Sequence, residues 1–386
     1  MADKFGFAEQ KVKLPDICTI QYGFAFDSKN FTENVDNIPL VRIRDVKRGY
    51  SETYYSGDYD EEYIVREGDL LIGMDGEFNI ARWRSRDSLL NQRVCRIQAQ
   101  KGTDEEYLRY VLVKKLKQIE ERTAFVTVKH LSAKELNAMA LEIPAYEAQK
   151  TLSSQLSKIE GLIELRQKQL EQLDTLIKAR FVEMSGDPFT NPMGWSVKPL
   201  SEVIVNANNG MARRGNDEEG SIVLRLVELQ DGYINYDCPN RILLNDKEKQ
   251  RYLLKDKDFL FARVNGNPLN VGRCAVFRDI GEDVYHNDHI IRVHFDEEQL
   301  NGCYASSIFN SDYGKSQMAN QIKTSAGQYT ISQDGIGAIE SMLPPMELQN
   351  RFASFVTQVD KLKVVVQESL NEAQTLFDSL MQEYFG

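Results

Sequence analysis

The chain has 386 residues, of which 42% are hydrophobic and 27% charged, and its formal net charge is −11. This length and composition allow two or more domains with cores of their own, and the absence of a long apolar run excludes a membrane-spanning helix. The five cysteines are scattered and form no Cys-x-x-Cys pair, which argues against zinc and for a reducing compartment. The first residues also lack the apolar core of a secretory signal, so we expect a cytoplasmic protein.

Residues 1–145 are predicted to form a mixed α/β domain, which we call the first head. Short β-rich runs occur at 38–43, 69–72 and 94–97, with turn signals between them. Residues 107–122 then carry apolar side chains at helical spacing. This alternation of short strands with a helix indicates a small domain with a core of its own.

Residues 146–186 are predicted to form the first of two long helices. Apolar side chains repeat every seven residues along it, which is typical of a coiled-coil seam. Arg166 and Arg180 interrupt the repeat, and Ser185-Gly186-Asp187-Pro188 is a strong stop signal. The seam residues are Leu156, Ile159, Ile163, Leu170, Leu173 and Ile177.

The second part of the chain repeats the first. Residues 187–345 form a second predicted head, and residues 346–386 a second helix. The segment LVRIRDVKRGY at 40–50 returns as VLRLVELQDGY at 223–233, and IPAYEAQ at 143–149 returns as LPPMELQ at 343–349. The offset between the copies grows from 183 to 200 within the heads and then stays at 200 through the helices. Loops tolerate changes of length and long helices do not, so each copy is predicted to be a variable head followed by a helix of fixed length.

The two predicted helices are expected to pack on each other as an antiparallel coiled coil. The seam of the second helix includes Phe355, Val359, Leu362, Val366 and Leu376. A coiled coil between two molecules would explain the same pattern. The first helix also carries a second apolar stripe, at Leu162, Leu165, Leu176 and Phe181. That stripe could contact the protein's own heads or form a docking face for helices of a partner.

Two segments carry a resemblance to a known family. The stretch QIKTSAGQYTISQDGIGAIESMLPPMELQ at 321–349 and VREGDLLIGMDG at 65–76 are similar to the specificity subunits of Type I restriction–modification enzymes. The order head, helix, head, helix, with P-x-x-E-x-Q at the start of both helices, resembles them over essentially the whole chain. The matching stretch of the first copy, 125–149, lacks the Ser-Ala-Gly-Gln element of the second.

The resemblance implies two target-recognition domains, each reading one half of a bipartite double-stranded DNA site. The helices would set the spacing between the two halves and dock methyltransferase subunits, of which we expect two. Those subunits would bring S-adenosylmethionine, and this chain would bind no cofactor or metal. A restriction and translocase subunit could join them.

Sequence patterns for catalysis are weak or missing. The chain has no Asn-Pro-Pro-Tyr or Asn-Pro-Pro-Phe methyltransferase motif and no phosphate-binding P-loop. Pro15-Asp16 with Asp27-Ser28-Lys29 fits a permissive nuclease pattern that the second copy lacks. His286, His289 and His294 could suggest a metal site, but a polar strand end is the better interpretation. We therefore expect a non-catalytic subunit.

The best candidates for DNA contact lie where the two copies differ. Arginine reads guanine with two hydrogen bonds, asparagine and glutamine read adenine, and lysine neutralises phosphate. Arg42 and Arg225, and likewise Arg96 and Arg292, occupy matched positions and are better explained as shared scaffold. The candidates are Arg82, Arg84, Arg86, Lys129 and His130 in the first head and Arg213, Arg214, Arg263, Asn265, Asn267, Arg273, Lys323, Thr324, Gln328 and Thr330 in the second.

The acidic balance leaves two other functions open. Phosphate binding needs local positive charge, and a net charge of −11 supplies little of it. A bivalent protein-binding scaffold, or an acidic DNA mimic that inhibits DNA enzymes, would fit that charge. The loops rich in Arg, Asn and Gln favour the DNA-specificity function over the mimic, and binding to DNA of defined sequence would separate it from the scaffold.

Overall fold

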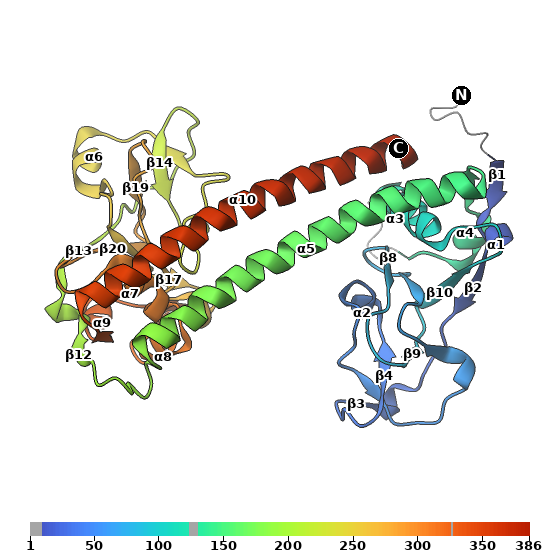
Figure 1. The fold of residues 1–386 in the computed structure, drawn as a ribbon, viewed down its shortest axis with the longest axis horizontal. Helices are drawn as coiled ribbons and strands as arrows, with labels where there is room; N and C mark the ends of the chain where they lie inside the picture. The colour runs from blue at the N-terminus through green and yellow to red at the C-terminus, as the bar shows by residue number, and fades with distance from the viewer. Residues whose placement is uncertain (1–9, 123–129, 326) are drawn as a thin grey trace. The chain divides into compact units, whose positions relative to one another are not determined.

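The computed structural model describes residues 10–122, 130–325 and 327–386 (Figure 1). Its contacts divide the chain into two units. Unit 1 combines residues 1–167 with 368–386, and unit 2 comprises residues 168–367. Each unit therefore contains one head and a segment of both long helices. Within the described residues, no helix has the length and apolar character needed to cross a membrane.

The first head is built from short strands and helices of mixed type. Its elements are β1 Gln10–Lys13, α1 Leu14–Ile17, β2 Cys18–Tyr22, η1 Ser28–Asn30, β3 Phe31–Thr32, β4 Ile38–Val41, α2 Ile43–Arg48, β5 Tyr54–Tyr55, η2 Glu61–Tyr63, β6 Ile64–Val65, β7 Leu70–Gly73, β8 Asn79–Arg82, β9 Ser88–Leu90, β10 Val94–Ala99, α3 Glu105–Arg122, α4 Ala133–Ala138 and β11 Ala140–Ile143. An antiparallel sheet has the strand order β2-β10-β7-β8, and α3 contacts its strands β8 and β10. A second sheet, β3-β5-β4-β9-β6, contains the parallel pair β4 and β9.

The second head repeats this topology and adds to it. Its elements are β12 Ser196–Pro199, η3 Leu200–Glu202, β13 Ile204–Asn209, β14 Ser221–Leu224, β15 Arg241–Ile242, α6 Asp246–Tyr252, β16 Phe259–Ala262, β17 Val264–Asn265, η4 Pro268–Asn270, β18 Cys274–Val276, β19 Val284–His286, β20 Ile290–Phe295, α7 Gly302–Phe309, α8 Asp312–Ala319, β21 Lys323–Ser325, β22 Gln328–Thr330, α9 Gln333–Gly337 and β23 Glu340–Leu343. The sheet β13-β20-β16-β18 corresponds to β2-β10-β7-β8, and the parallel pair β14 and β19 to β4 and β9. The sheet β17-β22-β21 is additional.

Each long helix begins with a buried glutamine that ties it to its own head. The helices are α5, Tyr146–Ser185, and α10, Met346–Phe385. The Gln149 side chain accepts a hydrogen bond from the Asp104 amide at 2.9 Å and donates to the Pro144 carbonyl at 2.9 Å. Gln349 makes the same contacts with Asn301 and Pro344. The glutamine that ends the P-x-x-E-x-Q motif therefore joins the start of α5 to the start of α3, and the start of α10 to the start of α7.

The two long helices pack antiparallel, as predicted, and the contacts within each unit define this register. In unit 1, Arg166 donates to Ser369 at 3.1 Å and the Tyr384 hydroxyl donates to Gln155 at 2.8 Å. In unit 2, Lys363 pairs with Asp174. The predicted fold class is confirmed: two mixed α/β heads, each followed by one helix of an antiparallel pair.

The last turns of the long helices complete the cores of the heads. In unit 1, Met381 and Phe385 of α10 join the apolar cluster that contains Leu152, Leu156 and residues of α3. In unit 2, Phe181 of α5 packs against Tyr304 and Phe352. Each head core therefore includes side chains from both long helices.

Two residues predicted for the seam lie outside it. Leu362 is 56% exposed and Leu376 50% exposed, whereas Val359 is buried. The heptad pattern placed them correctly on an apolar stripe, but the buried face of α10 is narrower than a full coiled-coil seam. The second stripe on α5 divides in the same way, because Phe181 is buried while Leu162, Leu165 and Leu176 are exposed.

Matched arginines in or directly after strands form internal ion pairs in both heads. Arg96 pairs with Asp69 at 3.0 Å, and Arg292 lies 3.5 Å from Asp258, which is fully buried. Arg225 is paired with the buried Glu228. These contacts support the interpretation of the matched arginines as scaffold.

Replacing Leu156 by Ala should lower the free energy of unfolding by about 2–5 kcal/mol, because the side chain is fully buried in the core shared by α5 and α10. Leu165→Ala on the same helix is the matched control. Its side chain is 52% exposed, so we expect a change within about 0.5 kcal/mol. Denaturant unfolding of both variants measures the difference, and equal losses would contradict the assignment of the buried face.

Candidate nucleic-acid interface

Several of the predicted DNA contacts are bound to acidic side chains of their own head. Arg82 pairs with Glu105 at 2.9 Å and Glu106 at 2.5 Å, both on α3. Arg84 pairs with Glu164 on α5 at 2.8 Å. These ion pairs join Arg82 to the head helix α3 and Arg84, whose side chain is 72% exposed, to α5.

Two arginines of the second head have similar structural roles. Arg213 pairs with Glu248 at the start of α6, at 2.8 Å, and Arg273 with Asp231 at 3.0 Å. Arg86 of the first head donates to the carbonyls of Val35 and Asn37. Each of these contacts joins loops within one head.

The predicted asparagines shape a turn. Asn265 accepts from the Asn267 amide at 2.9 Å, and Asn267 accepts from the Leu269 amide at 3.0 Å, which caps η4. Beside this turn, β22 pairs with β17 and β21, which brings Lys323, Thr324, Gln328 and Thr330 onto one small sheet with Asn265. Lys323, Thr324 and Gln328 are exposed. Lys129, a candidate in the first head, lies outside the described residues.

His130 belongs to a charged cluster that includes two residues not predicted from the sequence. Its Nδ1 lies 2.5 Å from Asp75 Oδ1, and the Arg93 guanidinium lies 3.1 Å from the imidazole. Arg93 Nε is also 3.5 Å from Asp75 Oδ2. The Arg93 side chain is 50% exposed, so the cluster faces solvent.

Arg214 and Arg263 meet in a similar cluster of the second head. Arg214 pairs with Asp288 at 2.7 Å and lies 3.1 Å from His289 Nε2. Arg263 donates to the Asp288 carbonyl at 3.0 Å. Burial, with the positive charges of Arg214 and Arg263, lowers the pKa of His289, while Asp288 opposes the shift. Each head thus places Arg, His and Asp side chains together at one exposed site.

The histidines considered as a metal site make separate contacts. The buried His286 faces the Tyr252 carbonyl, His289 faces Arg214, and His294 lies 3.2 Å from Asp258. Across the described residues, three or more potential metal ligands do not gather at any point. The acids of the permissive nuclease pattern, Asp16 and Asp27, cap short helices.

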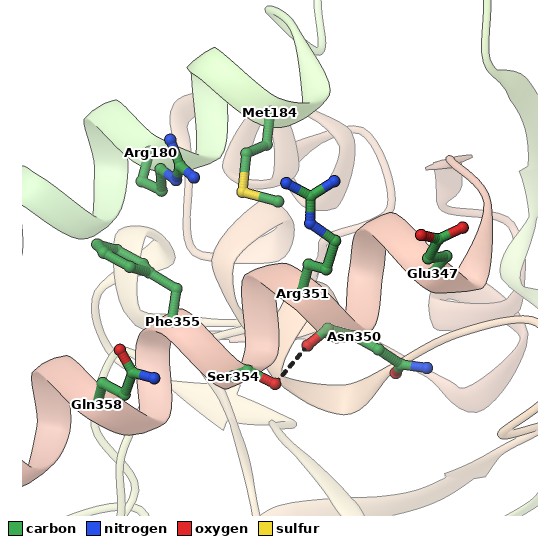
Figure 2. A pocket seen from close by; sticks show the side chains of 8 residues that line it. All are labelled: Arg180, Met184, Glu347, Asn350, Arg351, Ser354, Phe355 and Gln358. Atoms are coloured by element: carbon green, nitrogen blue, oxygen red, sulfur yellow. Dashed lines mark hydrogen bonds between the residues drawn. The ribbon is translucent and has the colours of Figure 1, made fainter.

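A shallow pocket in unit 2 lies between the end of α5 and the start of α10 (Figure 2). Arg180 and Met184 line it from α5, facing Arg351 and Phe355 of α10 in Figure 2. The Arg180 guanidinium lies 5.7 Å from the centre of the Phe355 ring and pairs with Glu183. This stacking explains the polar interruption of the seam at Arg180.

Comparison with known proteins gives a consistent result. Solved structures with this architecture include a Type I restriction–modification S subunit from M. genitalium, with a TM-score of 0.62 and 13% identity over 100% of this chain and 98% of that one. A second is a structure titled for complex assembly and conformational transition of the type I R-M system, with a TM-score of 0.54 and 15% identity over 99% of both chains. The chain therefore shares its fold with these two structures.

Sequence comparison gives the family. Residues 9–175 match the Type I restriction modification DNA specificity domain, so the chain carries a domain of that family and the predicted resemblance is confirmed. The chain is 29% identical to the Type I restriction enzyme EcoBI specificity subunit of Escherichia coli, over 70% of this chain and 62% of that protein. It is 27% identical to the StySPI specificity subunit of Salmonella potsdam, over 68% of this chain and 60% of that protein. The matches thus span about 60% of the length of these relatives.

The stability of the second head should depend on pH through His286. Burial lowers the pKa of His286 to about 4 from 6.5, and its Nε2 has no hydrogen-bond partner. As the pH falls below about 6.5, His286 is protonated in the unfolded chain but stays neutral in the folded protein, which favours unfolding. The free energy of unfolding should therefore decrease by about 3 kcal/mol between about pH 6.5 and about pH 4.

His286→Leu is the matched variant, because Leu90 occupies the equivalent position of the first head. Denaturant unfolding of both proteins between pH 7 and pH 4 should show a smaller acid loss for the variant. Parallel curves for the variant and the wild-type protein would refute the role of His286.

Proposed function

We propose that this chain is the DNA sequence-specificity subunit of a Type I restriction–modification system. Each head reads one half of a bipartite target, and the α5–α10 coiled coil sets the spacing between the halves and docks methyltransferase subunits. The chain itself is non-catalytic in this proposal. S-adenosylmethionine belongs to the methyltransferase, and an endonuclease subunit can join the assembly.

The observation that carries the proposal is one scaffold built twice with different polar side chains on it. Both heads have the same four-stranded sheet and the same parallel strand pair. Their exposed charged clusters contain Arg93 and His130 in one head and Arg214 and His289 in the other. Two heads with the same backbone topology but different exposed polar side chains suit a DNA target whose two halves differ in sequence. A bivalent protein scaffold would not require this combination, and the family match favours DNA.

Exposed apolar residues on the long helices support docking of two methyltransferase subunits. In unit 1, Leu162, Leu165 and Leu376 are exposed, and the Arg166–Ser369 and Gln155–Tyr384 contacts place Leu376 level with Leu162. We call these three residues the first leucine patch. Exposed large apolar side chains at matched positions of this kind are typical of protein contact sites.

Unit 2 carries an equivalent patch. Leu176, Leu362 and Val365 are exposed there, and they stand 200 positions from Leu376, Leu162 and Leu165. The internal repeat thus produces two copies of one apolar surface, each beside a head. Two equal surfaces fit two equal partners, which is the basis for proposing two methyltransferase subunits.

The proposal predicts a split methylation motif that depends on this chain. Methylated adenines are mapped across the genome of a host that expresses the chain with its neighbouring methyltransferase gene, and a control host lacks only the chain. A bipartite motif should appear in the first host alone. If an active methyltransferase produced no such motif, the protein scaffold or the DNA mimic would become the better function.

Charge in the first leucine patch should disrupt the assembly. Leu162→Asp combined with Leu165→Asp should reduce the methyltransferase from two copies to one per chain, because burying each leucine contributes about 1.5–3 kcal/mol and the patch of unit 2 stays intact. The control is Val182→Asp on the same helix, with a side chain 51% exposed and outside the patch. Equal binding by both variants would rule out the patch as the docking surface.

A further inference from the structure

The two charged clusters occupy the same place in the backbone of the two heads. We define the first junction as residues 74–75, 91–93 and 130–131, and the second junction as residues 263–264, 287–289 and 330–331. We infer that these junctions are the base-reading centres of the heads. Arg93 is the main base contact of the first, and Arg263 and His289 are those of the second, together with Arg214, which pairs with Asp288 of that junction. This inference rests on the proposed function and assigns its residues.

Backbone hydrogen bonds establish that the junctions are equivalent. The Met74 amide donates to the Arg93 carbonyl at 2.9 Å, and the Arg263 amide donates to the His289 carbonyl at 2.7 Å. A second pair of backbone hydrogen bonds repeats the pattern. The Leu131 amide donates to the Met74 carbonyl at 2.7 Å, and the Ile331 amide donates to the Arg263 carbonyl at 2.9 Å. Arg93 and His289 therefore stand at one position of a shared framework.

The turn before the last central strand is shared as well. Asn91 and Asn287 are both buried, each forms a parallel bridge, to Phe24 and Met211 respectively, and each accepts from the amide three residues later. The third segment is also equivalent, because His130 bridges Asp75 and Thr330 pairs with Val264. Three chain segments thus meet in the same way in both heads.

The side chains on this framework are alike at one buried position and differ at the positions around it. Leu131 and Ile331 are both buried and apolar. Around this position, the first junction has Asp75, Arg93 and His130, whereas the second has the buried Val264 and the half-buried His289 and Thr330 at the same places. A surface that reads a different base sequence in each head has to vary at such positions while its framework stays constant.

The backbone of Arg93 provides an independent sign of function. Its φ is +72°, in the left-handed region that favours glycine, and the other positive-φ positions among the described residues of the first head, Gly49, Gly68, Gly76 and Gly102, are all glycines. Arginine in this conformation is unfavourable for the local fold, and such residues concentrate at functional sites. Glycine would suit this turn better than arginine, so the unfavourable backbone conformation indicates that the guanidinium group itself has a function.

The contacts around Arg93 position it for a base without using all of its donors. A guanidinium carries five N–H donors in one plane. Asp75 and His130 contact it from the side of Nε and Nη1. This holds the plane in place for a bidentate contact to guanine N7 and O6 in a major groove. Arg214 is oriented by Asp288 and His289 in the same manner.

The test uses the full chain assembled with its methyltransferase and a pool of DNA duplexes with both half-sites randomised. In Arg93→Gly, discrimination at one base pair of the first head's half-site should fall about ten- to a hundredfold, while the second half-site is read unchanged. Glycine is favoured at this φ, so the melting temperature should not fall. His289→Ala should relax only the other half-site.

Arg66→Ala is the matched control, because Arg66 is an exposed arginine at the opposite end of β7 and should leave both half-sites intact. Full discrimination by Arg93→Gly and His289→Ala, with a split motif in the wild-type assembly, would overturn this inference and leave the proposed function standing. No split motif in the wild-type assembly would overturn both.

Discussion

The burial of each long helix's last turns in a head core is the constraint on which the other features depend. Met381 and Phe385 of α10 complete the core of unit 1, and Phe181 of α5 does the same in unit 2. One inserted residue would rotate these side chains by about 100° and shift them by about 1.5 Å, away from the cavity that they fill. This explains why the offset between the copies stays at 200 along the helices while it drifts within the heads.

The same constraint separates the conserved and variable parts of each head. Gln149 and Gln349 fix the start of a long helix against α3 or α7, so the side of the head that holds the helix cannot vary freely. The junctions are formed by turns and strand ends, which tolerate substitution when their buried framework is kept. One chain can therefore change its reading residues without changing its helices. This arrangement is what a protein with exchangeable target specificity requires.

The sequence was sufficient for the parts of this structure that depend on periodicity. The duplication, the mixed heads and the helices within a residue or two of Tyr146–Ser185 and Met346–Phe385 follow from spacing alone. The exposure of Leu362 and Leu376 could not be predicted, because a heptad pattern does not say which part of an apolar stripe the partner helix covers. Arg93 was missed because the members of its cluster, Asp75, Arg93 and His130, lie 18 to 55 positions apart along the chain. Arg82 and Arg84 stood out only because several charged residues lie close together in the sequence there. A comparison of Arg93 with His289 at matched turn positions was the one sequence signal that could have found it.

The acidic balance of the chain is compatible with DNA reading through these clusters. Arg93 and Arg214 each face an aspartate, so neither presents an unopposed positive charge to the phosphate backbone. Such arginines bind backbone phosphates only weakly and without regard to sequence, because the carboxylate already supplies a charged acceptor. Guanine offers two acceptors in the plane of the guanidinium and can complete its hydrogen bonding without displacing the aspartate. A net charge of −11 then reduces non-specific binding more than specific binding. In the proposed assembly, partner subunits would supply the remaining phosphate contacts.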